Sequence, residues 1–417
     1  MRVAIVGAGY SGTVAAAEVA RRAPGAAVLL IEKSGRFAAG AAYSTTSPGH
    51  LLNVRARNMS ALEGEPDHFA YWAAARGHGP DDYVPRRDYH LYLAQLLDSV
   101  PAVTRVTGEA AAVEDGAVVL TSGERIGCDF VILAGGNHPS RLPAMFGPLA
   151  IDDPWSAEGK AAVARAAAAG DELLLVGTGL TMVDIAISLE EAGFAGRITA
   201  VSRRGLVPRP HVSPPAAPVE RRPRGRLGDL VREVRSVSPW RGSVDGLRPF
   251  SAALWKGLSE AEQRRFLRHL RPWWDVHRHR IAPAVAARIQ AMRDGGRLEV
   301  AAGRIVRVEG GTATIARRGG GELRRSFAAA VNCTGPQGDI SRVEDPLVRQ
   351  LLASGRARPD RLGLGLEVDE GSRVCGSGPS PALYAIGPLS KGAFWEIVAV
   401  PDIRGQAAAV AKAIAAL

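Results

Sequence analysis

Residues 1–36 read MRVAIVGAGYSGTVAAAEVARRAPGAAVLLIEKSGR, and this stretch decides the fold. The apolar run 3–6 predicts a strand, and the alanine-rich run 13–22 predicts a helix. Between them, Gly7, Gly9 and Gly12 complete a G-x-G-x-x-G motif. A second apolar run, 28–31, ends in Glu32, 20 residues past Gly12. Strand, glycine turn, helix, strand and acid in this order predict a dinucleotide-binding unit.

Each part of this motif has a physical role. Gly7 permits the tight turn, Gly9 lets the backbone approach a pyrophosphate, and Gly12 lets helix and strand pack closely. The free N–H groups and the dipole at the start of the helix favour phosphates. The Glu32 carboxylate can accept hydrogen bonds from a ribose 2′-hydroxyl and would repel a 2′-phosphate. The bound adenosine is therefore expected to lack that phosphate, as in FAD and NAD.

The composition bounds the class of protein. The chain has 417 residues, enough for two or three domains, and its 46% hydrophobic and 23% charged residues are ordinary for a globular protein. A net charge of +10 would suit nucleic acid or a membrane surface. No nucleic-acid motif accompanies the charge, so an arginine-rich composition or a site for anionic phosphates explains it better.

The cysteines and histidines exclude further classes. Cys128, Cys333 and Cys375 stand alone without a C-x-x-C pair, which argues against a disulfide framework and against a dithiol redox centre. No cluster of Cys or His has the spacing of metal ligands. No apolar run is long enough to span a bilayer, and no secretory signal is evident. We expect a soluble cytoplasmic protein without a metal, and the oligomeric state stays open.

The rest of the first unit contains a long loop and a small β-meander. Residues 38–62 are rich in Gly, Ser, Thr and Asn, with Met59 among their apolar anchors. Such a loop after the first strands lies where an α/β sheet binds its ligand. Residues 102–136 predict a meander that returns to a buried strand, 130–133, closed by Gly135 and Gly136.

A second copy of the opening pattern begins at residue 171. DELLLVGTGLTMVDIAISLEEAGFAGRITAVSRRG contains a strand, Gly177 and Gly179, a helix and another strand, with Met182 at the third glycine position. Where the first unit has Glu32, this one has a serine followed by Arg203 and Arg204. Guanidinium groups bind a 2′-phosphate bidentately and by charge, so this unit is predicted to prefer NADPH. The alternative is two ordinary surface arginines.

Residues 206 to about 285 interrupt this second unit. They begin with a Pro- and Arg-rich loop and continue as helices broken by prolines. We expect an insertion that caps the second unit, with Trp255, Trp273 and Trp274 in its core rather than on a substrate. The run HRHR at 277–280 is interpreted as a structural or solvated segment rather than a metal site.

The chain ends with two more dinucleotide-unit signals. AAVNCTGP at 329–336 resembles FVILAGGNHP at 130–139, since each is an apolar strand followed by Gly and Pro. A last strand at 383–386 leads through Gly387 to a helix whose start, near Val400 to Ile403, could direct N–H groups at the flavin end of a dinucleotide.

These signals predict an α/β fold of two Rossmann-like, three-layer dinucleotide-binding domains with a helical insertion. Residues 1–155 would form the first part of an FAD-binding domain. Residues 156–335 would form an NAD(P)H-binding domain with the insertion at about 206–285. Residues 336–417 would return to complete the FAD-binding domain.

The layout resembles the flavoproteins with two dinucleotide-binding domains, on GAGYSG (7–12), GTGLTM (177–182), NCTGP (332–336) and AIGP with VPDIRGQ (385–388 and 400–406). HLLNVRARNMSAL (50–62), VPRRDYHLYL (84–93) and LRPWWDVHRHR (270–280) resemble a bacterial branch of FAD/NAD(P)-binding proteins similar to single-component flavin monooxygenases, including N-hydroxylating ones. The resemblance covers essentially the whole chain. It departs at Gly387-Pro388, where many reductase-type relatives have Gly-Asp.

The resemblance implies two cofactors, FAD and NADPH, and names residues for them. Gly7, Gly9, Gly12 and Glu32 would hold the adenosine diphosphate half of FAD, and Gly387 with the following helix start would hold the flavin end. Gly177, Gly179, Arg203 and Arg204 would hold NADPH. Further predicted cofactor contacts are Tyr10, Ser11, Lys33, Asn53, Met59, Val113, Gly135 and Pro401.

The leading functional prediction is a monooxygenase that uses NADPH and O₂. It would oxygenate a nitrogen or sulfur nucleophile of a small molecule through a C4a-peroxyflavin, with the flavin supplying the chemistry. The predicted catalytic residues are Asn53, Lys391 and Trp395, with the Ser390 hydroxyl as a further candidate. The arginine-rich insertion weakly favours an anionic substrate.

Three other functions remain open on the sequence alone. One is an NAD(P)H dehydrogenase or reductase that passes electrons from FAD to another acceptor. The second is a non-enzymatic flavin-bearing sensor. A nucleic-acid binder, suggested by charge alone, is the least favoured, and no membrane partner is predicted.

Overall fold

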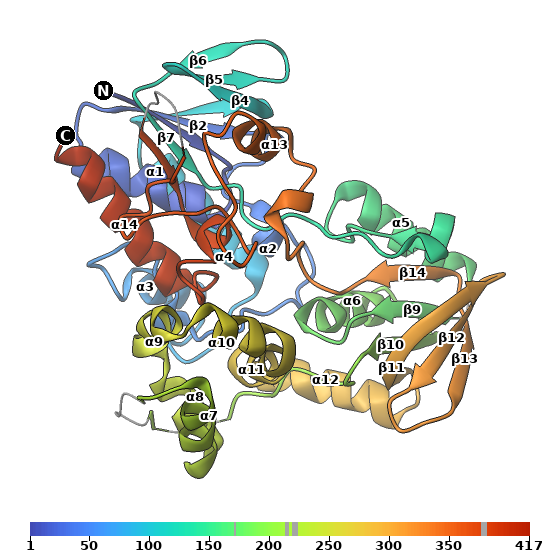
Figure 1. Ribbon diagram of the computed structural model, residues 1–417. Coiled ribbons are helices and arrows are strands. Elements are labelled where there is room, and N and C mark those ends of the chain that lie inside the picture. Colours follow the sequence, from blue (N-terminus) through green and yellow to red (C-terminus); the bar gives the residue numbers. More distant parts are fainter. Residues whose placement is uncertain (171, 213–216, 219–223, 377–381) are drawn as a thin grey trace.

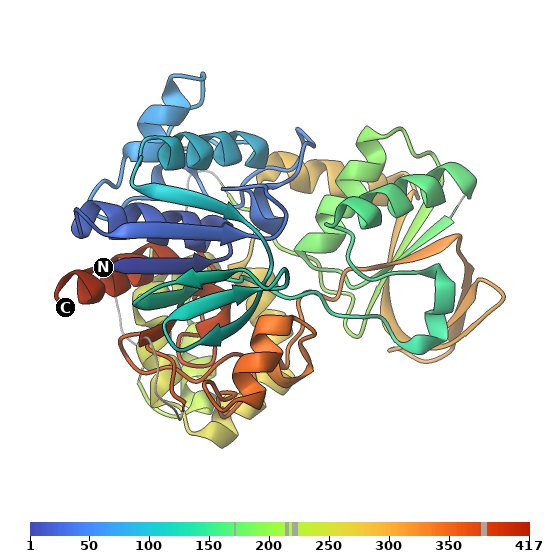
Figure 2. The same ribbon diagram turned by 90° about the horizontal axis from the view of Figure 1, so that it is seen from above.

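The computed structural model describes residues 1–170, 172–212, 217–218, 224–376 and 382–417. Two sheets organise these residues, and they lie side by side when the molecule is seen from above (Figure 2). The fold class predicted from the sequence is confirmed, because both sheets have a parallel core and are covered on both faces.

The first sheet is wholly parallel and has the order β15-β7-β1-β2-β3. Its strands are β1 (Arg2–Val6), β2 (Ala27–Glu32), β3 (Val103–Thr107), β7 (Phe130–Leu133) and β15 (Ala382–Ala385). The last strand comes from the C-terminal part of the chain, so this unit closes only when the chain returns to it (Figure 1).

Two different layers cover the first sheet, because successive side chains of a strand point to opposite faces. Val3 and Ile5 face a helical layer, whereas Ala4 faces the β-meander and one helix. The helical layer contains α1 (Tyr10–Arg22), α2 (Gly40–Tyr43), η1 (Ala56–Asn58), α3 (His68–Ala74), α4 (Arg86–Asp98) and α14 (Val400–Ala415). The opposite layer contains β4 (Ala110–Glu114), β5 (Ala117–Leu120), β6 (Arg125–Gly127), η5 (Ile340–Arg342) and α13 (Pro346–Ala353).

The second sheet has the order β13-β12-β11-β10-β9-β14-β8. The pairs β11–β12 and β12–β13 are antiparallel, and the other neighbouring pairs are parallel. Its strands are β8 (Ala150–Ile151), β9 (Glu172–Val176), β10 (Arg197–Ser202), β11 (Leu298–Glu309), β12 (Thr312–Arg317), β13 (Glu322–Ser326) and β14 (Ala329–Asn332). The helices beside it are η2 (Ala144–Leu149), α5 (Ala157–Ala169), α6 (Leu180–Glu191) and α12 (Pro283–Asp294). β8 precedes residue 156 and yet pairs with this sheet.

Two connecting segments run side by side from one sheet to the other. One follows β7 and the other follows β14, and they are joined where Asn332 Nδ2 donates to the Ser140 carbonyl oxygen at 2.8 Å. The Gln337 N–H donates to the His138 carbonyl oxygen at 2.9 Å.

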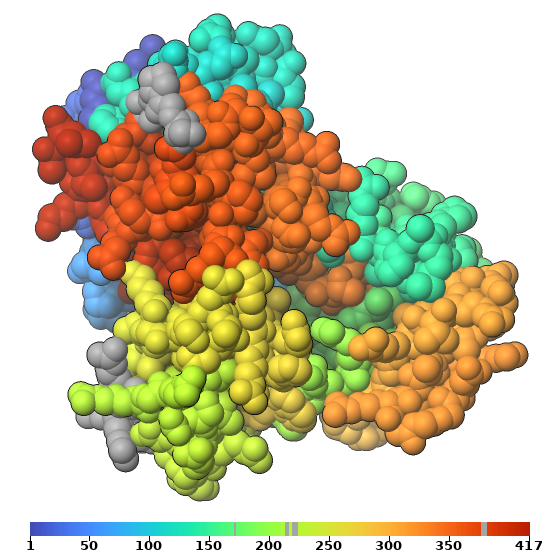
Figure 3. Space-filling view, in the orientation of Figure 1, coloured from blue at the N-terminus to red at the C-terminus, as the bar shows by residue number. Residues whose placement is uncertain are grey.

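The helical insertion contains α7 (Leu227–Ser236), α8 (Trp240–Gly246), η3 (Arg248–Phe250), α9 (Ser251–Gly257), α10 (Glu260–Arg265), η4 (Phe266–Leu270) and α11 (Arg271–Arg278). The expectation that it caps the second unit is only partly right. Arg204 of that unit donates to the His269 carbonyl oxygen of η4 at 3.5 Å, but Trp255 and Leu258 pack with Trp395, which belongs to the returning C-terminal segment. Figure 3 shows the insertion against that segment. The insertion therefore contacts both units.

Candidate active site

The first glycine turn has the geometry that a phosphate-binding turn requires. Gly7 has a φ of +97°, and a Cβ on it would lie 2.6 Å from the Ala134 carbonyl oxygen. A Cβ on Gly12 would lie 1.8 Å from the Gly7 carbonyl oxygen, so only glycine lets α1 approach β1 this closely. Gly9 precedes α1 and brings no capping side chain, which leaves the N–H groups of the first turn available to an anion.

The Glu32 carboxylate is held beside this turn by three hydrogen bonds. Its Oε2 accepts from the Ala8 N–H at 2.9 Å, and its Oε1 accepts from the N–H and the hydroxyl of Ser34 at 3.1 and 2.8 Å. Glu32 is half-buried at the carboxyl end of β2. A negative charge is therefore fixed at the position from which the motif reads a ribose.

The C-terminal segment meets the start of α1 from the other end of the chain. Gly387 has a φ of +65°, and a Cβ on it would lie 2.7 Å from the Ser11 hydroxyl. The Tyr10 hydroxyl donates to the Val400 carbonyl oxygen at 3.0 Å, across 390 residues of sequence. α14, with Pro401 in its first turn, begins at Val400 without a side-chain cap. Pro401 has no N–H, and the Asp402 N–H donates to the Ala399 carbonyl oxygen at 3.1 Å, so in this first turn the Val400 N–H is the group left for a ligand.

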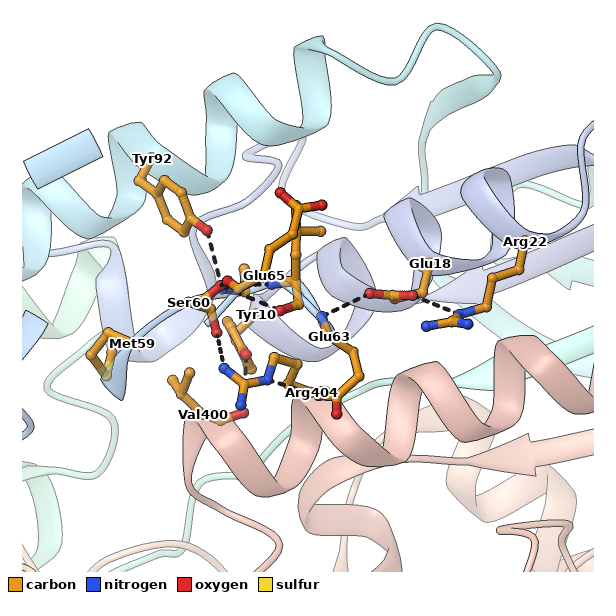
Figure 4. A network of polar contacts seen from close by, with 12 residues as sticks. Tyr10, Glu18, Arg22, Met59, Ser60, Glu63, Glu65, Tyr92, Val400 and Arg404 are labelled. Atoms are coloured by element: carbon orange, nitrogen blue, oxygen red, sulfur yellow. Dashed lines mark hydrogen bonds and ion pairs between the residues drawn. The ribbon is translucent and has the colours of Figure 1, made fainter. Parts of the chain in front are cut away.

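A polar network fixes the loop that carries Met59 against both helices (Figure 4). Arg404 of α14 donates to the Ser60 carbonyl oxygen at 2.9 Å and pairs with Glu63 at 3.0 Å. The Glu63 N–H donates to the buried Glu18 carboxylate of α1 at 3.1 Å. Met59 is itself buried. The network orders the edge of the candidate flavin site.

The second glycine turn repeats the geometry of the first. Gly177 has a φ of +118°, and a Cβ on it would lie 2.1 Å from the Cys333 carbonyl oxygen. Gly179 precedes α6 without a side-chain cap, and a Cβ there would meet nothing within 4 Å. Met182, at the third glycine position, is fully buried in the core of this unit. The second turn is thus open in front of α6.

The carboxyl end of β10 carries hydroxyl and guanidinium groups. The Ser202 and Thr178 hydroxyls hydrogen-bond to each other at 2.8 Å. Arg203 is exposed, and no described residue forms an ion pair with it. Arg204 donates to the His269 carbonyl oxygen at 3.5 Å. Among the residues that the structure describes, neither guanidinium group is paired with a carboxylate.

The predicted catalytic residues lie at two borders of the helical insertion. The Asn53 carbonyl oxygen accepts from His211 Nε2 at 2.9 Å, next to the start of the insertion. Lys391 lies over the Trp395 ring, with Nζ 5.0 Å from the ring centroid. Burial, and second the charge of Arg271, lower the pKa of Lys391 to about 8. That ammonium group therefore titrates near neutral pH.

The remaining predicted residues are placed differently. Ser390 is fully buried and donates to the Gly387 carbonyl oxygen at 2.9 Å, so its hydroxyl is already committed. Gly135 follows Ala134 beside the first turn. Lys33 is exposed and pairs with Glu109 at 3.3 Å. The structure therefore brings Gly135 close to the glycine turn and leaves Lys33 on the surface.

Val113 lies in the β-meander, with its side chain buried in the core formed with α13. Its N–H donates to Gln350 Oε1 at 3.2 Å. That amide is already engaged within the protein, which weakens the expectation that it contacts a cofactor.

Sequence reasoning missed the ion pairs that fasten the insertion to the C-terminal segment. Arg278 pairs with Glu396 at 3.0 Å, and both side chains are largely buried. Arg248 pairs with Asp402 at 3.4 Å. The one signal in the sequence is that two acids interrupt the otherwise apolar run FWEIVAVPDI at 394–403. The HRHR run is structural: Arg280 is buried and pairs with Asp245.

The three cysteines are free, and Cys128 and Cys333 are buried. In the described part of the chain, no three His, Cys, Asp or Glu side chains gather as metal ligands would. None of the described helices combines the length and apolar character needed to cross a membrane.

Comparisons with known proteins agree with this geometry. Residues 4–138 match the protein-family model described as FAD-NAD(P)-binding. A search of curated proteins found no match.

Several solved structures have the same fold. The ornithine hydroxylase of Pseudomonas aeruginosa aligns with a TM-score of 0.67 at 16% identity, covering 100% of this chain and 98% of that chain. The ornithine N-hydroxylase of Kutzneria sp. 744, solved with reduced FAD, NADP⁺ and L-ornithine, aligns with a TM-score of 0.66 at 14% identity over 99% of this chain and 98% of that chain. The bacillithiol disulfide reductase of Staphylococcus aureus aligns with a TM-score of 0.59 at 13% identity over 100% of this chain and 98% of that chain. The chain thus carries an FAD-NAD(P)-binding domain within the fold that these flavoproteins share.

Proposed function

We propose that the chain is an FAD-dependent, NADPH-using monooxygenase that oxygenates a nitrogen, or alternatively a sulfur, of a small molecule. One observation carries the proposal. Two glycine turns each lead into a helix without a side-chain cap, and the residues at the end of the following strand differ in charge. The first unit has the Glu32 carboxylate there, and the second has the guanidinium groups of Arg203 and Arg204. FAD lacks the 2′-phosphate that NADPH carries, so each cofactor suits one unit.

The residues of the first unit fit FAD. The start of α1 would hold the pyrophosphate, Glu32 the adenosine ribose, and the Val400 N–H at the start of α14 the flavin end. When bound, FAD accepts hydride from NADPH and, once reduced, reacts with O₂ to provide the oxygen atom that is transferred. No protein nucleophile is required.

The contribution of the chain is position and electrostatics. Arg203 and Arg204 would orient NADPH through its 2′-phosphate. Lys391, with a pKa near 8, can hold a proton and donate a hydrogen bond at neutral pH. Tyr10 and the Met59 loop would keep water from the flavin end, because the Tyr10 hydroxyl bonds to Val400 at the start of α14 and Met59 is buried in the same core.

Similarity in fold supports the choice of nitrogen. Two of the proteins named above are ornithine hydroxylases. A disulfide reductase also has the same fold, and this sequence has no C-x-x-C pair that would serve as a dithiol redox centre. Transfer of electrons from FAD to another acceptor is the second candidate.

The test measures NADPH oxidation, O₂ uptake and H₂O₂ release together, with L-ornithine, L-lysine and n-alkylamines as trial substrates. The proposal expects at least one amine to lower H₂O₂ below the O₂ consumed and to yield a hydroxylamine. H₂O₂ equal to O₂ with every amine and with sulfide substrates would favour the second candidate. Reduction of bound FAD no faster than that of free flavin would contradict both and favour a sensor.

A further inference from the structure

The helices of the insertion line a partly open cavity of about 680 Å³, here called the insertion cavity. Its walls come from α7, α8, α9, η4 and α11, and from Trp395 of the C-terminal segment. Five of the seven tryptophans of the chain line it: Trp240, Trp255, Trp273, Trp274 and Trp395. Cavities of roughly 300–1,000 Å³ are the usual size for sites that bury a small organic molecule.

The side chains that line the cavity are mostly apolar, and the few polar ones mostly hydrogen-bond within the protein. The Ser251 hydroxyl donates to the Leu247 carbonyl oxygen at 3.1 Å, and His277 Nδ1 hydrogen-bonds to the Trp273 carbonyl oxygen at 2.7 Å. Arg235 is exposed, at the rim. A charged group deep in this cavity would lose its hydration without gaining a partner, whereas hydrocarbon would be stabilised there.

Two stacked tryptophans, Trp255 and Trp395, form the wall of the cavity next to the C-terminal segment. The Trp395 side chain is 95% buried, and no described residue accepts a hydrogen bond from its indole Nε1. The other buried tryptophan of the pair does have an acceptor, since Trp255 Nε1 donates to the Gly392 carbonyl oxygen at 2.8 Å. The Trp395 indole N–H is fully buried, so the apolar part of the ring rather than this N–H lines the cavity.

The insertion cavity borders the candidate flavin site. Trp395 stacks on Trp255 with ring centroids 4.7 Å apart, and it lies five residues before Val400, where α14 begins. Trp274 Nε1 donates to Glu396 Oε1 at 2.8 Å, which fastens the cavity wall to this segment. Figure 1 shows the insertion helices beneath the same segment. A molecule in the cavity would therefore lie against the segment that leads into α14, the helix proposed to hold the flavin end.

We infer that the insertion cavity binds the apolar body of the substrate, an aliphatic or aromatic group of drug-like size. This inference rests on the proposed function. L-Ornithine and L-lysine, charged at both ends, do not suit such a lining. A membrane or a protein surface does not suit it either, because Leu227, Leu258 and Val244 are more than nine-tenths buried and out of reach of a flat surface.

The experiment titrates n-alkan-1-ols of four to ten carbons into the FAD-loaded protein in a calorimeter. Neutral alcohols change chain length without changing charge. The inference expects affinity to rise by about fourfold per added methylene until the cavity is full, which corresponds to full burial of each group. Two substitutions should each lower the affinity for octan-1-ol at least about tenfold, because the larger side chain displaces several methylene groups of the ligand. Leu254→Trp fills the cavity from α9, and Val231→Phe fills it from α7. Ala253→Trp is the matched control on the exposed side of α9 and should bind as the wild type does.

Affinity independent of chain length, or equal weakening by Ala253→Trp and Leu254→Trp, would overturn the inference. The visible spectrum of bound FAD checks that each variant is folded. Turnover separates the inference from the function: oxygenation of short and long n-alkylamines with equal KM would overturn the inference and leave the monooxygenase standing. Chain-length-dependent binding with no oxygenation of any amine or sulfide would support an apolar ligand and remove the proposed function.

Discussion

Glu32 and Ser202 occupy the same position in the two dinucleotide-binding units and differ in charge. The Gly7 N–H donates to the Ile31 carbonyl oxygen at 2.9 Å, and the Gly177 N–H donates to the Val201 carbonyl oxygen at 2.8 Å. The residue after each acceptor therefore faces the turn in the same way. A carboxylate stands there in the first unit and a hydroxyl in the second, which is why we assign FAD to one and NADPH to the other.

Glu32→Ala is expected to weaken FAD binding by roughly 10- to 100-fold, because hydrogen bonds to a charged group contribute about 1.5–3 kcal/mol. Quenching of flavin fluorescence during titration of the apoprotein measures it. Glu109→Ala removes a surface carboxylate that pairs with Lys33 and should leave the affinity unchanged. Equal effects of the two changes would contradict the assignment of Glu32 to the ribose.

Replacing Arg203 and Arg204 together by alanine is expected to raise KM for NADPH by about 10-fold or more and to leave KM for NADH nearly unchanged, since only NADPH carries the 2′-phosphate. Steady-state NAD(P)H oxidation measures both constants. Arg197→Ala is the control at the opposite end of the same strand, β10. An equal loss with both cofactors would mean that the two arginines are ordinary surface residues.

The pH dependence of turnover is expected to report Lys391. Burial, followed by the charge of Arg271, lowers its pKa to about 8, so its ammonium form predominates below that pH and is lost above it. Turnover that uses this proton should fall above about pH 8. In Lys391→Met this fall in the pH profile of turnover should disappear, whereas Lys412→Met, at an exposed lysine, should keep it. An unchanged profile in Lys391→Met would exclude Lys391 from the reaction.

Arg86→Met is expected to destabilise the protein by about 3 kcal/mol, because removing one partner of a buried ion pair leaves the other charge unpaired. Arg86 donates to both carboxylate oxygens of Asp184 at 2.7 and 3.2 Å, and this pair joins the first unit to α6 of the second. Urea unfolding followed by circular dichroism measures the change. Arg232→Met, which breaks the exposed pair with Asp229, should cost less than about 1 kcal/mol. Equal losses of unfolding free energy in the two variants would mean that the Arg86–Asp184 pair contributes no more to stability than a surface pair does.

Local patterns made much of this architecture predictable. The glycine turns, the strands beside them and the returning strand β15 depend on residues close together in the sequence, and all lie in the predicted order. The similarity between 130–139 and 329–336 also has a structural counterpart, because the Ala134 N–H donates to the Val6 carbonyl oxygen and the Cys333 N–H donates to the Val176 carbonyl oxygen, both at 2.8 Å.

The insertion could not be predicted in the same way. Its attachment depends on contacts such as Trp274 with Glu396 and Arg248 with Asp402, separated by 122 and 154 residues. Its cavity depends on how several short amphipathic helices pack, and a tryptophan in such a helix has the same local pattern whether it fills a core or lines a hollow. Trp255 is buried as expected, whereas Trp273 is 43% exposed.

The central claim is that the first dinucleotide-binding unit binds FAD and that the second binds NADPH, which transfers a hydride to this FAD. Anaerobic stopped-flow mixing of the FAD-loaded protein with NADPH tests it most directly. The account predicts that bound FAD is bleached at a rate that saturates with NADPH concentration and that NADH is far less efficient. A protein that stays colourless on reconstitution with FAD, or whose bound FAD is reduced no faster than free flavin, would contradict it.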